Sequence, residues 1–321
     1  MKNRLLSSVF VSRLASVITT LFGISIFVFI VLRVIPGDSI TGSLGIETSA
    51  LNPEQIAALR AYYGIDKSLI GQYFSWMTSF LSGDLGFAYS SGIPVLDLTK
   101  SALPVTIQLA LVGTISGVII GISVGMFSAS KPGSFRDFAG QFFGLLALAV
   151  PGFVLATTLV TIMANKFGYF PNGYEYMAPW EDPWMNFQQM IFPGLVLGIA
   201  VAAPVMRTTR SALLETVDKD FIRTAYGKGV RDKAVQFKHV LRNSLIPIVT
   251  MTGIQFGYLL GGAVIVEKIF AMPGMGRQIL DAINKREYAT VQSSIMIFAI
   301  MFVLINLATD MIYRRIDPRI K

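Results

Sequence analysis

The sequence predicts an all-α integral membrane protein with six transmembrane helices. Its mean hydropathy is +0.60, and only 14% of its residues are charged, against about a quarter in a soluble domain. Six windows of 19 to 30 residues contain no Asp, Glu, Lys or Arg, and an apolar helix needs roughly 20 residues to cross the hydrocarbon core. We predict one transmembrane domain over residues 1–321, with spans at about 14–32, 103–129, 138–165, 186–206, 244–266 and 289–312.

The first span is predicted to be a membrane anchor that is not cleaved. Lys2 and Arg4 precede it as in a signal peptide, but its apolar core is too long and no small-x-small cleavage pattern follows. With a cytoplasmic N-terminus, 18 of the 27 basic residues and only 7 of the 19 acidic residues lie on the cytoplasmic side. The positive-inside rule therefore predicts cytoplasmic N- and C-termini. Because the net charge of +8 is distributed by membrane side, we expect lipid contacts and no nucleic-acid partner.

A small helical extracytoplasmic region is predicted between the first two spans, at residues 36–100. Asn52-Pro53-Glu54 is a helix start that precedes an amphipathic segment ending at Gly64. A second amphipathic helix is expected over 70–81, and a helix through Ile279, Leu280 and Ile283 is expected in a re-entrant or cap element after the fifth span. The region after the first span is either a packed cap or a docking surface, and both readings stay open.

Glycines recur every four residues in the second and fifth spans. This spacing keeps small residues near one helix face, so that another helix backbone can approach closely. We expect helix packing at most of these positions, with subunit contact or sliding helices as the alternative. The residues are Gly113, Gly117, Gly121, Gly125, Gly253, Gly257 and Gly261.

Polar and proline residues within the spans are the candidates for a transport pathway. Prolines are expected to interrupt the third and fourth spans, and the polar side chains, Gln108 included, fit interhelical hydrogen bonds as well as a pathway. No acidic or basic residue lies at a span centre, so the sequence predicts no proton or sodium relay. The pathway candidates are Pro151, Pro204, Gln255 and Asn306.

The residues needed for catalysis are missing. The chain has no cysteine and a single histidine, His239, which excludes a thiolate or multi-histidine metal site and a Ser-His-Asp triad within the spans. Gly227-Lys228-Gly229 lacks the partners of a phosphate-binding loop. We expect neither an enzyme nor a bound cofactor.

The segment 207–242 is the strongest functional signal. It carries nine Lys or Arg against four Asp or Glu between two apolar runs, so it must be a water-exposed loop. Its interior predicts a helix, a break at Gly229 and another helix. A structured cytoplasmic loop of this kind indicates contact with a partner.

The spacing in this loop resembles that of permease subunits of ATP-binding-cassette (ABC) importers. Their pattern is Glu-Ala-Ala, three residues, Gly, nine residues and Ile-x-Leu-Pro; here Ala225, Gly229 and Leu241 match it literally. The departures resemble the peptide and nickel branch, which is typified by Arg-Thr-Ala-x-x-Lys-Gly and His-x-Leu-Arg-Asn-x-Leu-Ile-Pro, here between Arg223 and Pro247. Ser39 replaces the proline that many relatives have after Gly-Asp.

The resemblance implies the first permease of a heterodimer with a second permease, two ATPase subunits that bind ATP and Mg, and an external solute-binding protein. It implies the cytoplasmic (inner) membrane of a bacterium or archaeon and di- or oligopeptide cargo, with nickel, glutathione and oligosaccharides as alternatives. A secondary transporter driven by an ion gradient is the rival from another class. The implied ATPase-coupling residues are Arg223, Thr224, Ala225, Lys228, Gly229, Arg231, His239, Leu241, Arg242 and Pro247.

Overall fold

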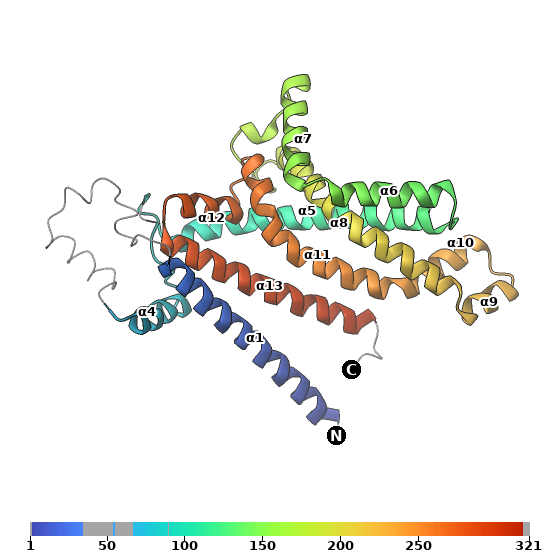
Figure 1. The fold of residues 1–321 in the computed structure, drawn as a ribbon, viewed down its shortest axis with the longest axis horizontal. Helices are drawn as coiled ribbons and strands as arrows, with labels where there is room; N and C mark the ends of the chain where they lie inside the picture. The colour runs from blue at the N-terminus through green and yellow to red at the C-terminus, as the bar shows by residue number, and fades with distance from the viewer. Residues whose placement is uncertain (1, 35–53, 55–66, 89, 317–321) are drawn as a thin grey trace. The chain divides into compact units, whose positions relative to one another are not determined.

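The computed structural model describes residues 2–34, 54, 67–88 and 90–316 (Figure 1). In this part of the chain the regular elements are helices, with one isolated bridge between Phe87 and Pro94. The chain divides into two compact units, Met1–Leu103 with Arg277–Val303 and Pro104–Gly276 with Leu304–Lys321. The predicted extracytoplasmic helix that starts at Asn52 falls largely on residues outside the described part.

Among the residues that the structure describes, four helices are long and apolar enough to cross a membrane, and the number rises to six if each of two bent helix pairs counts as one span. The four are α1 (Lys2–Val34), α5 (Val95–Ala129), α8 (Pro183–Val217) and α13 (Tyr288–Ile316). Each extends beyond its predicted span because the helix continues into polar residues at its ends. The prediction of several apolar helices is confirmed, whereas the count of six depends on the bent pairs.

The third predicted span, 138–165, is two helices and not one. α6 (Phe135–Ala149) and α7 (Gly152–Phe167) meet at an angle of 92°. Val150 and Pro151 lie between them in extended conformations, as expected where a proline removes a backbone donor and disfavours helix in the residue before it.

The expectation that Pro204 interrupts the fourth span is wrong, because α8 is one helix from Pro183 to Val217. Another proline of α8, Pro193, deprives the carbonyl of Gln189 of its helical donor. Asn172 Nδ2 donates to this carbonyl at 3.0 Å. On either side of Pro204 along the chain, Val201 and Val205 lie against the glycines of α5.

In the first unit, the predicted helix over 70–81 is confirmed as α4 (Leu69–Leu81), which the Ser68 side chain caps. α4 packs against α1 through aromatic contacts, with the Phe29 and Tyr73 ring centroids 5.3 Å apart. The hydroxyls of Ser25 and Tyr73 lie 2.8 Å apart. The helix predicted through Ile279, Leu280 and Ile283 is also present, as α12 (Met275–Asn284), most of which belongs to this unit.

In the second unit, α5 packs directly on α8 through the glycine series. A Cβ at Gly117 would lie 2.5 Å from Val201 Cβ, and one at Gly125 would lie 2.7 Å from Thr209 Cβ. Gly113 faces Leu197 and Gly121 faces Val205 in the same way, each about one turn from Gly117. The glycines therefore permit a contact that no larger residue would allow.

The second glycine series behaves unevenly along α11 (Arg242–Ile269), which contains the 53° bend of the second pair between Leu259 and Ala263. Gly253 lies against Thr309 of α13, and Gly257 is buried. At Gly261, no described atom lies within 4 Å of where a Cβ would stand. Close packing at this series is therefore seen at Gly253 and not at Gly261.

Gln108 takes part in an interhelical hydrogen bond, as predicted. Its Nε2 donates to Asn186 Oδ1 at 2.6 Å, joining α5 to α8, and Tyr176 Oη donates to its Oε1 at 2.9 Å. Asp182 caps α8 by accepting from the backbone N–H groups of Trp184 and Met185. These contacts hold the 168–182 connection against the start of α8.

Candidate functional site

The candidate site begins where α8 ends. α9 (Asp220–Gly227) follows after Asp218 and Lys219. Asp220 in its first turn places a carboxylate at the positive end of the helix dipole. The predicted sequence of helix, glycine break and helix is confirmed by α9, Gly229 and α10 (Asp232–Ala234).

One face of α9 is anchored in a small apolar core. Ile222 and Ala225 are buried with Leu213 of α8 and with Val235 and Val240 of the following segment. Met126 and Ala129, at the end of α5, pack against the same core. Because α9 is tied to α8, α5 and the segment leading to α11, it cannot move far without moving them.

Gly229 makes the turn after α9 possible. Its φ is +73°, a left-handed conformation that costs a side-chain-bearing residue about 1–2 kcal/mol. The N–H of Gly229 donates to Tyr226 O at 2.9 Å, and that of Val230 donates to Ala225 O at 3.2 Å. These two bonds form a Schellman motif, and Val230 closes it by packing on the apolar core.

The opposite face of the loop is exposed. It presents the aromatic side chains of Phe221 and Tyr226, 42% and 45% exposed. Desolvation of the Tyr226 hydroxyl, together with the nearby carboxylate of Asp232, raises its pKa, so it remains a neutral phenol. Basic or polar residues share this surface, namely Arg223, Thr224, Lys228 and Arg231.

The charged groups of this surface are available to a partner. Arg223 pairs with Asp220 at 3.7 Å, but both side chains are more than three-quarters exposed, and exposed pairs of this kind contribute little. An external carboxylate could therefore replace Asp220 at little cost.

After α10 the chain forms a π-helix, η3 (Val235–Leu241), which leads into α11. His239 is half-buried within it, and its backbone carbonyl accepts a hydrogen bond from Asn243 Nδ2 at 2.6 Å. Leu241 packs on the apolar core, whereas Arg242 and Pro247 are exposed on α11. Ala225 and Leu241 thus share one core with Val230, the residue after Gly229, while Pro247 lies inside the next helix.

A hydroxyl pair ties α8 to α11 near this core. Ser244 Oγ lies 3.0 Å from Thr216 Oγ1. It also lies 3.0 Å from each of the Ala212 and Val240 carbonyl oxygens, to which it can donate a hydrogen bond. Both side chains are buried. The contact links the ends of the two helices that carry the loop.

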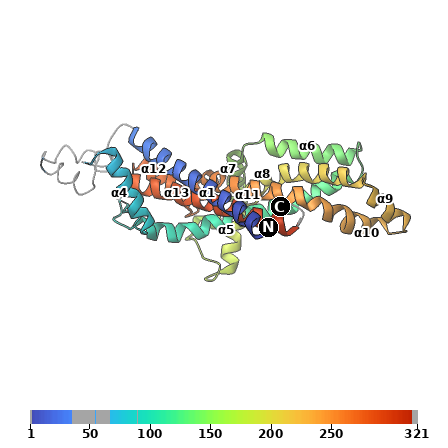
Figure 2. The same cartoon turned by 90° about the horizontal axis from the view of Figure 1, so that it is seen from below.

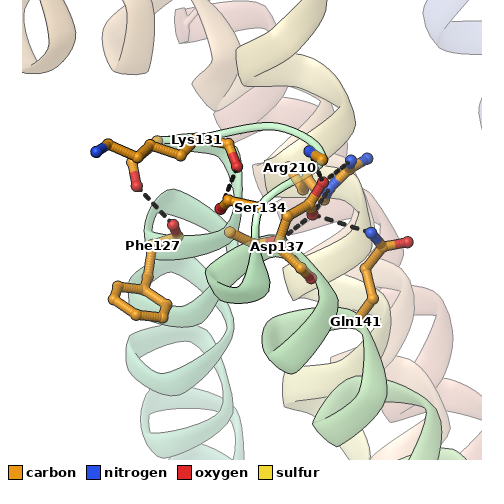
Figure 3. A network of polar contacts seen from close by, with 9 residues as sticks. Phe127, Lys131, Ser134, Asp137, Gln141 and Arg210 are labelled. Carbon is orange, nitrogen blue, oxygen red and sulfur yellow. Dashed lines mark hydrogen bonds and ion pairs between the residues drawn. The ribbon is translucent and has the colours of Figure 1, made fainter.

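Sequence reasoning missed a buried ion pair in the same unit (Figure 3). Arg210 Nε and Nη2 donate to the two carboxylate oxygens of Asp137 at 2.6 and 2.7 Å. Ser128, Gly133 N–H and Gln141 also donate to this carboxylate. The pair fastens the turn between α5 and α6 to α8, and α6 runs beside α8 (Figure 2). The sequence offered one signal for this pair, because Asp137 directly precedes the charge-free run 138–165.

A second missed group is Glu267, fully buried in the last turn of α11. Thr106 Oγ1 donates to its carboxylate at 2.7 Å and accepts from Met275 N–H at 2.9 Å. A side chain at Gly274 would collide with this carboxylate. Glu267 therefore anchors the turn after α11 to α5.

The pathway candidates do not form a cluster. Pro151 caps α7 and is exposed, and Pro204 is half-buried in α8. Gln255 Nε2 donates to Met251 Sδ within α11 at 3.6 Å, and Asn306 is half-buried in α13. No hydrogen bond among the described residues joins any two of them. Within the same residues, no three His, Asp or Glu side chains are placed to hold a metal.

Comparison with known families covers nearly the whole chain. Residues 117–321 match the family described as "Binding-protein-dependent transport system inner membrane component", and residues 6–110 match its N-terminal companion. The glutathione transport system permease protein GsiC of Pectobacterium atrosepticum is 36% identical over 97% of this chain and 98% of its own. The dipeptide transport system permease protein DppB of Alkalihalophilus pseudofirmus is 36% identical over 96% of this chain and 98% of its own.

Solved structures show the same fold at lower identity. A chain of the inward-facing MetNI methionine ABC transporter aligns with a TM-score of 0.55 at 17% identity, covering 68% of this chain and 96% of its own. A chain of an amino acid ABC transporter aligns with a TM-score of 0.52 at 18% identity, covering 68% of this chain and 94% of its own. The chain belongs to the family of inner-membrane permease subunits of binding-protein-dependent ABC importers, in the branch that contains the dipeptide and glutathione permeases.

Proposed function

We propose that this permease forms half of a translocation pathway for short peptides and that its exposed α9 surface docks on a partner ATPase. The observation that carries the proposal is the two-faced character of α9. Ile222 and Ala225 fix one face to the helix bundle, while Phe221, Arg223 and Tyr226 point away from it. A surface that is both anchored and exposed suits the transfer of force from a partner.

The proposed route of that force follows the contacts from the loop outward. α9 shares its core with α8 and η3, and the buried Ser244–Thr216 contact joins α8 to α11. From α8 the glycine contacts lead to α5. Displacement of α9 would thus tilt α8 and α11 together, as in the rigid-body and shear motions of other switching proteins.

The break at Pro151 fits the proposed pathway. α6 and α7 meet there at 92°, and irregular backbone at membrane depth is tolerated where protein or a water-filled cavity surrounds it. A second permease subunit packed against this break would complete such a cavity. We place both termini on the cytoplasmic side, from the distribution of basic residues.

Short peptides are the proposed cargo. One relative is named for dipeptides and another for glutathione, itself a peptide, and their identities to this chain are equal at 36%. Nickel complexes and oligosaccharides remain alternatives. Uptake of labelled dipeptide and of labelled glutathione, each competed with the other, would rank the two named cargoes.

The test of the assembly is purification of this chain from its native membrane in mild detergent, with identification of co-purifying proteins by mass spectrometry. We expect two ATPase subunits, a second permease and, with cargo present, a solute-binding protein. Recovery of the folded chain without an ATPase would contradict the proposal.

A transporter driven by an ion gradient is the competing function. Glu267 favours it to a degree, because it is a buried carboxylate in α11. Its place in the last helical turn and its bond to Thr106 favour a structural role. Uptake into proteoliposomes separates the two: import that needs internal or external ATP and survives an ionophore supports the ABC function, and import abolished by the ionophore refutes it.

A further inference from the structure

We propose that the groove between α6 and α8 binds an anionic phospholipid of the cytoplasmic leaflet. The groove has a volume of about 420 Å³, within the range of roughly 300–1,000 Å³ of small-molecule sites. Its lining residues come from these two helices alone, namely Phe138, Gln141, Phe142, Leu145, Met206, Arg207 and Arg210.

The two ends of the groove differ in chemistry. α6 and α8 run in opposite directions here, because Asp137 meets Arg210 and Gly144 meets Met206. Phe138 and Arg210 therefore lie at one end of the groove, Leu145 and Met206 lie at the other, and Gln141, Phe142 and Arg207 lie between them. An amphiphile with an acidic head and an apolar tail matches this order.

Arg207 supplies the unmatched positive charge. The Arg210 charge is balanced by Asp137, which it contacts with two hydrogen bonds (Figure 3). Arg207 is exposed, and in the described part of the chain it has neither a carboxylate nor a hydrogen-bond partner. A phosphate can accept two parallel bonds from such a guanidinium, so the charge of the groove favours an anionic ligand.

The position of Arg207 favours a lipid as the source of that phosphate. It is the first charged residue after the charge-free run 183–206 of α8, which places it at the level of the lipid head groups on the cytoplasmic side of the proposed topology. Phe138 and Phe142, both more than half exposed, stack with ring centroids 6.2 Å apart and form an apolar wall beside it. Basic pockets between helices on this side of a membrane are known to hold acidic lipid head groups.

The test uses the assembled transporter in nanodiscs of phosphatidylcholine with increasing phosphatidylglycerol, and counts retained phosphatidylglycerol by native mass spectrometry. We expect Arg207→Gln to raise the lipid fraction needed for half-occupancy about fivefold. Lys131→Gln is the matched control, because it removes an exposed positive charge in the turn before α6 but outside the groove. Leu145→Trp, which fills the apolar end, should also reduce occupancy.

Three results would overturn the proposal. Equal losses in Arg207→Gln and Lys131→Gln would mean attraction to the membrane surface in general. Displacement of the lipid by inorganic phosphate at millimolar concentration would mean a simple anion site. Efficient disulfide cross-linking of Arg207→Cys to the second permease would mean that a protein covers the groove.

Discussion

Replacement of Gly229 tests whether the turn after α9 matters for transport. Gly229 has a φ of +73°, and no described atom lies within 4 Å of where its Cβ would stand. Gly229→Ala therefore meets no steric obstacle, and its cost is the left-handed backbone alone, about 1–2 kcal/mol. This shifts the balance between the native turn and alternatives by a factor of about 5–30. Gly229→Val should cost more and Gly229→Asn less, because asparagine tolerates this conformation better.

Gly227 is the matched control. It is exposed, it ends α9 and a Cβ there would also meet nothing, but its φ is not positive. Gly227→Ala should be neutral or stabilise α9 by up to about 1 kcal/mol. The assay is ATP-driven uptake by the assembled transporter in proteoliposomes, alongside ATPase binding and thermal unfolding. Uptake should decrease from Gly229→Asn to Gly229→Ala to Gly229→Val, while the unfolding temperature falls by only a few degrees. Wild-type uptake by Gly229→Val, or an equal loss in Gly227→Ala, would refute the reasoning.

Three further predictions concern the stability of the bundle, measured by unfolding in mixed micelles. Gly117→Ala should lower the free energy of unfolding by about 1–3 kcal/mol, because its Cβ would meet Val201. Gly23→Ala, whose Cβ would meet nothing, should leave it unchanged. Equal effects of the two changes would contradict the close contact between α5 and α8. Arg210→Met should lower the free energy of unfolding by about 3–5 kcal/mol, because Asp137 stays buried without its charge partner. The double variant Arg210→Met with Asp137→Leu should regain more than half of this loss. Asp182→Ala should cost about 1 kcal/mol through loss of the α8 cap, and no change would show that the cap is dispensable.

Much of the fold follows from charge placement in the sequence. Absence of charge over about 20 residues identifies a segment that lipid can surround, and α1, α5, α8 and α13 lie on such windows. α4 and α12 were predictable because their apolar residues recur at helical spacing. The turn at Gly229 was predictable because a glycine between two helical patterns marks a left-handed end.

The rest depends on tertiary contacts that a single sequence does not reveal. Pro151 and Pro204 look alike in the sequence, yet only the first stands at a break, and α8 continues as one helix through Pro204. Asp137 and Arg210 are 73 residues apart, and only folding makes them a pair. The candidate site was predicted better than the pathway, because its residues are local whereas a pathway between two permeases needs the second chain.

Cross-linking from α9 tests the central claim most directly. The chain has no cysteine, so Thr224→Cys would introduce a unique thiol on the exposed face of α9, and Tyr174→Cys would place one in the exposed loop between α7 and α8 as a control. We predict that a short bifunctional reagent links Thr224→Cys, and not Tyr174→Cys, to the ATPase subunit of the assembled transporter, with a yield that changes when ATP binds. Absence of an ATPase adduct from Thr224→Cys in an intact complex would contradict the assignment of α9 as the coupling surface.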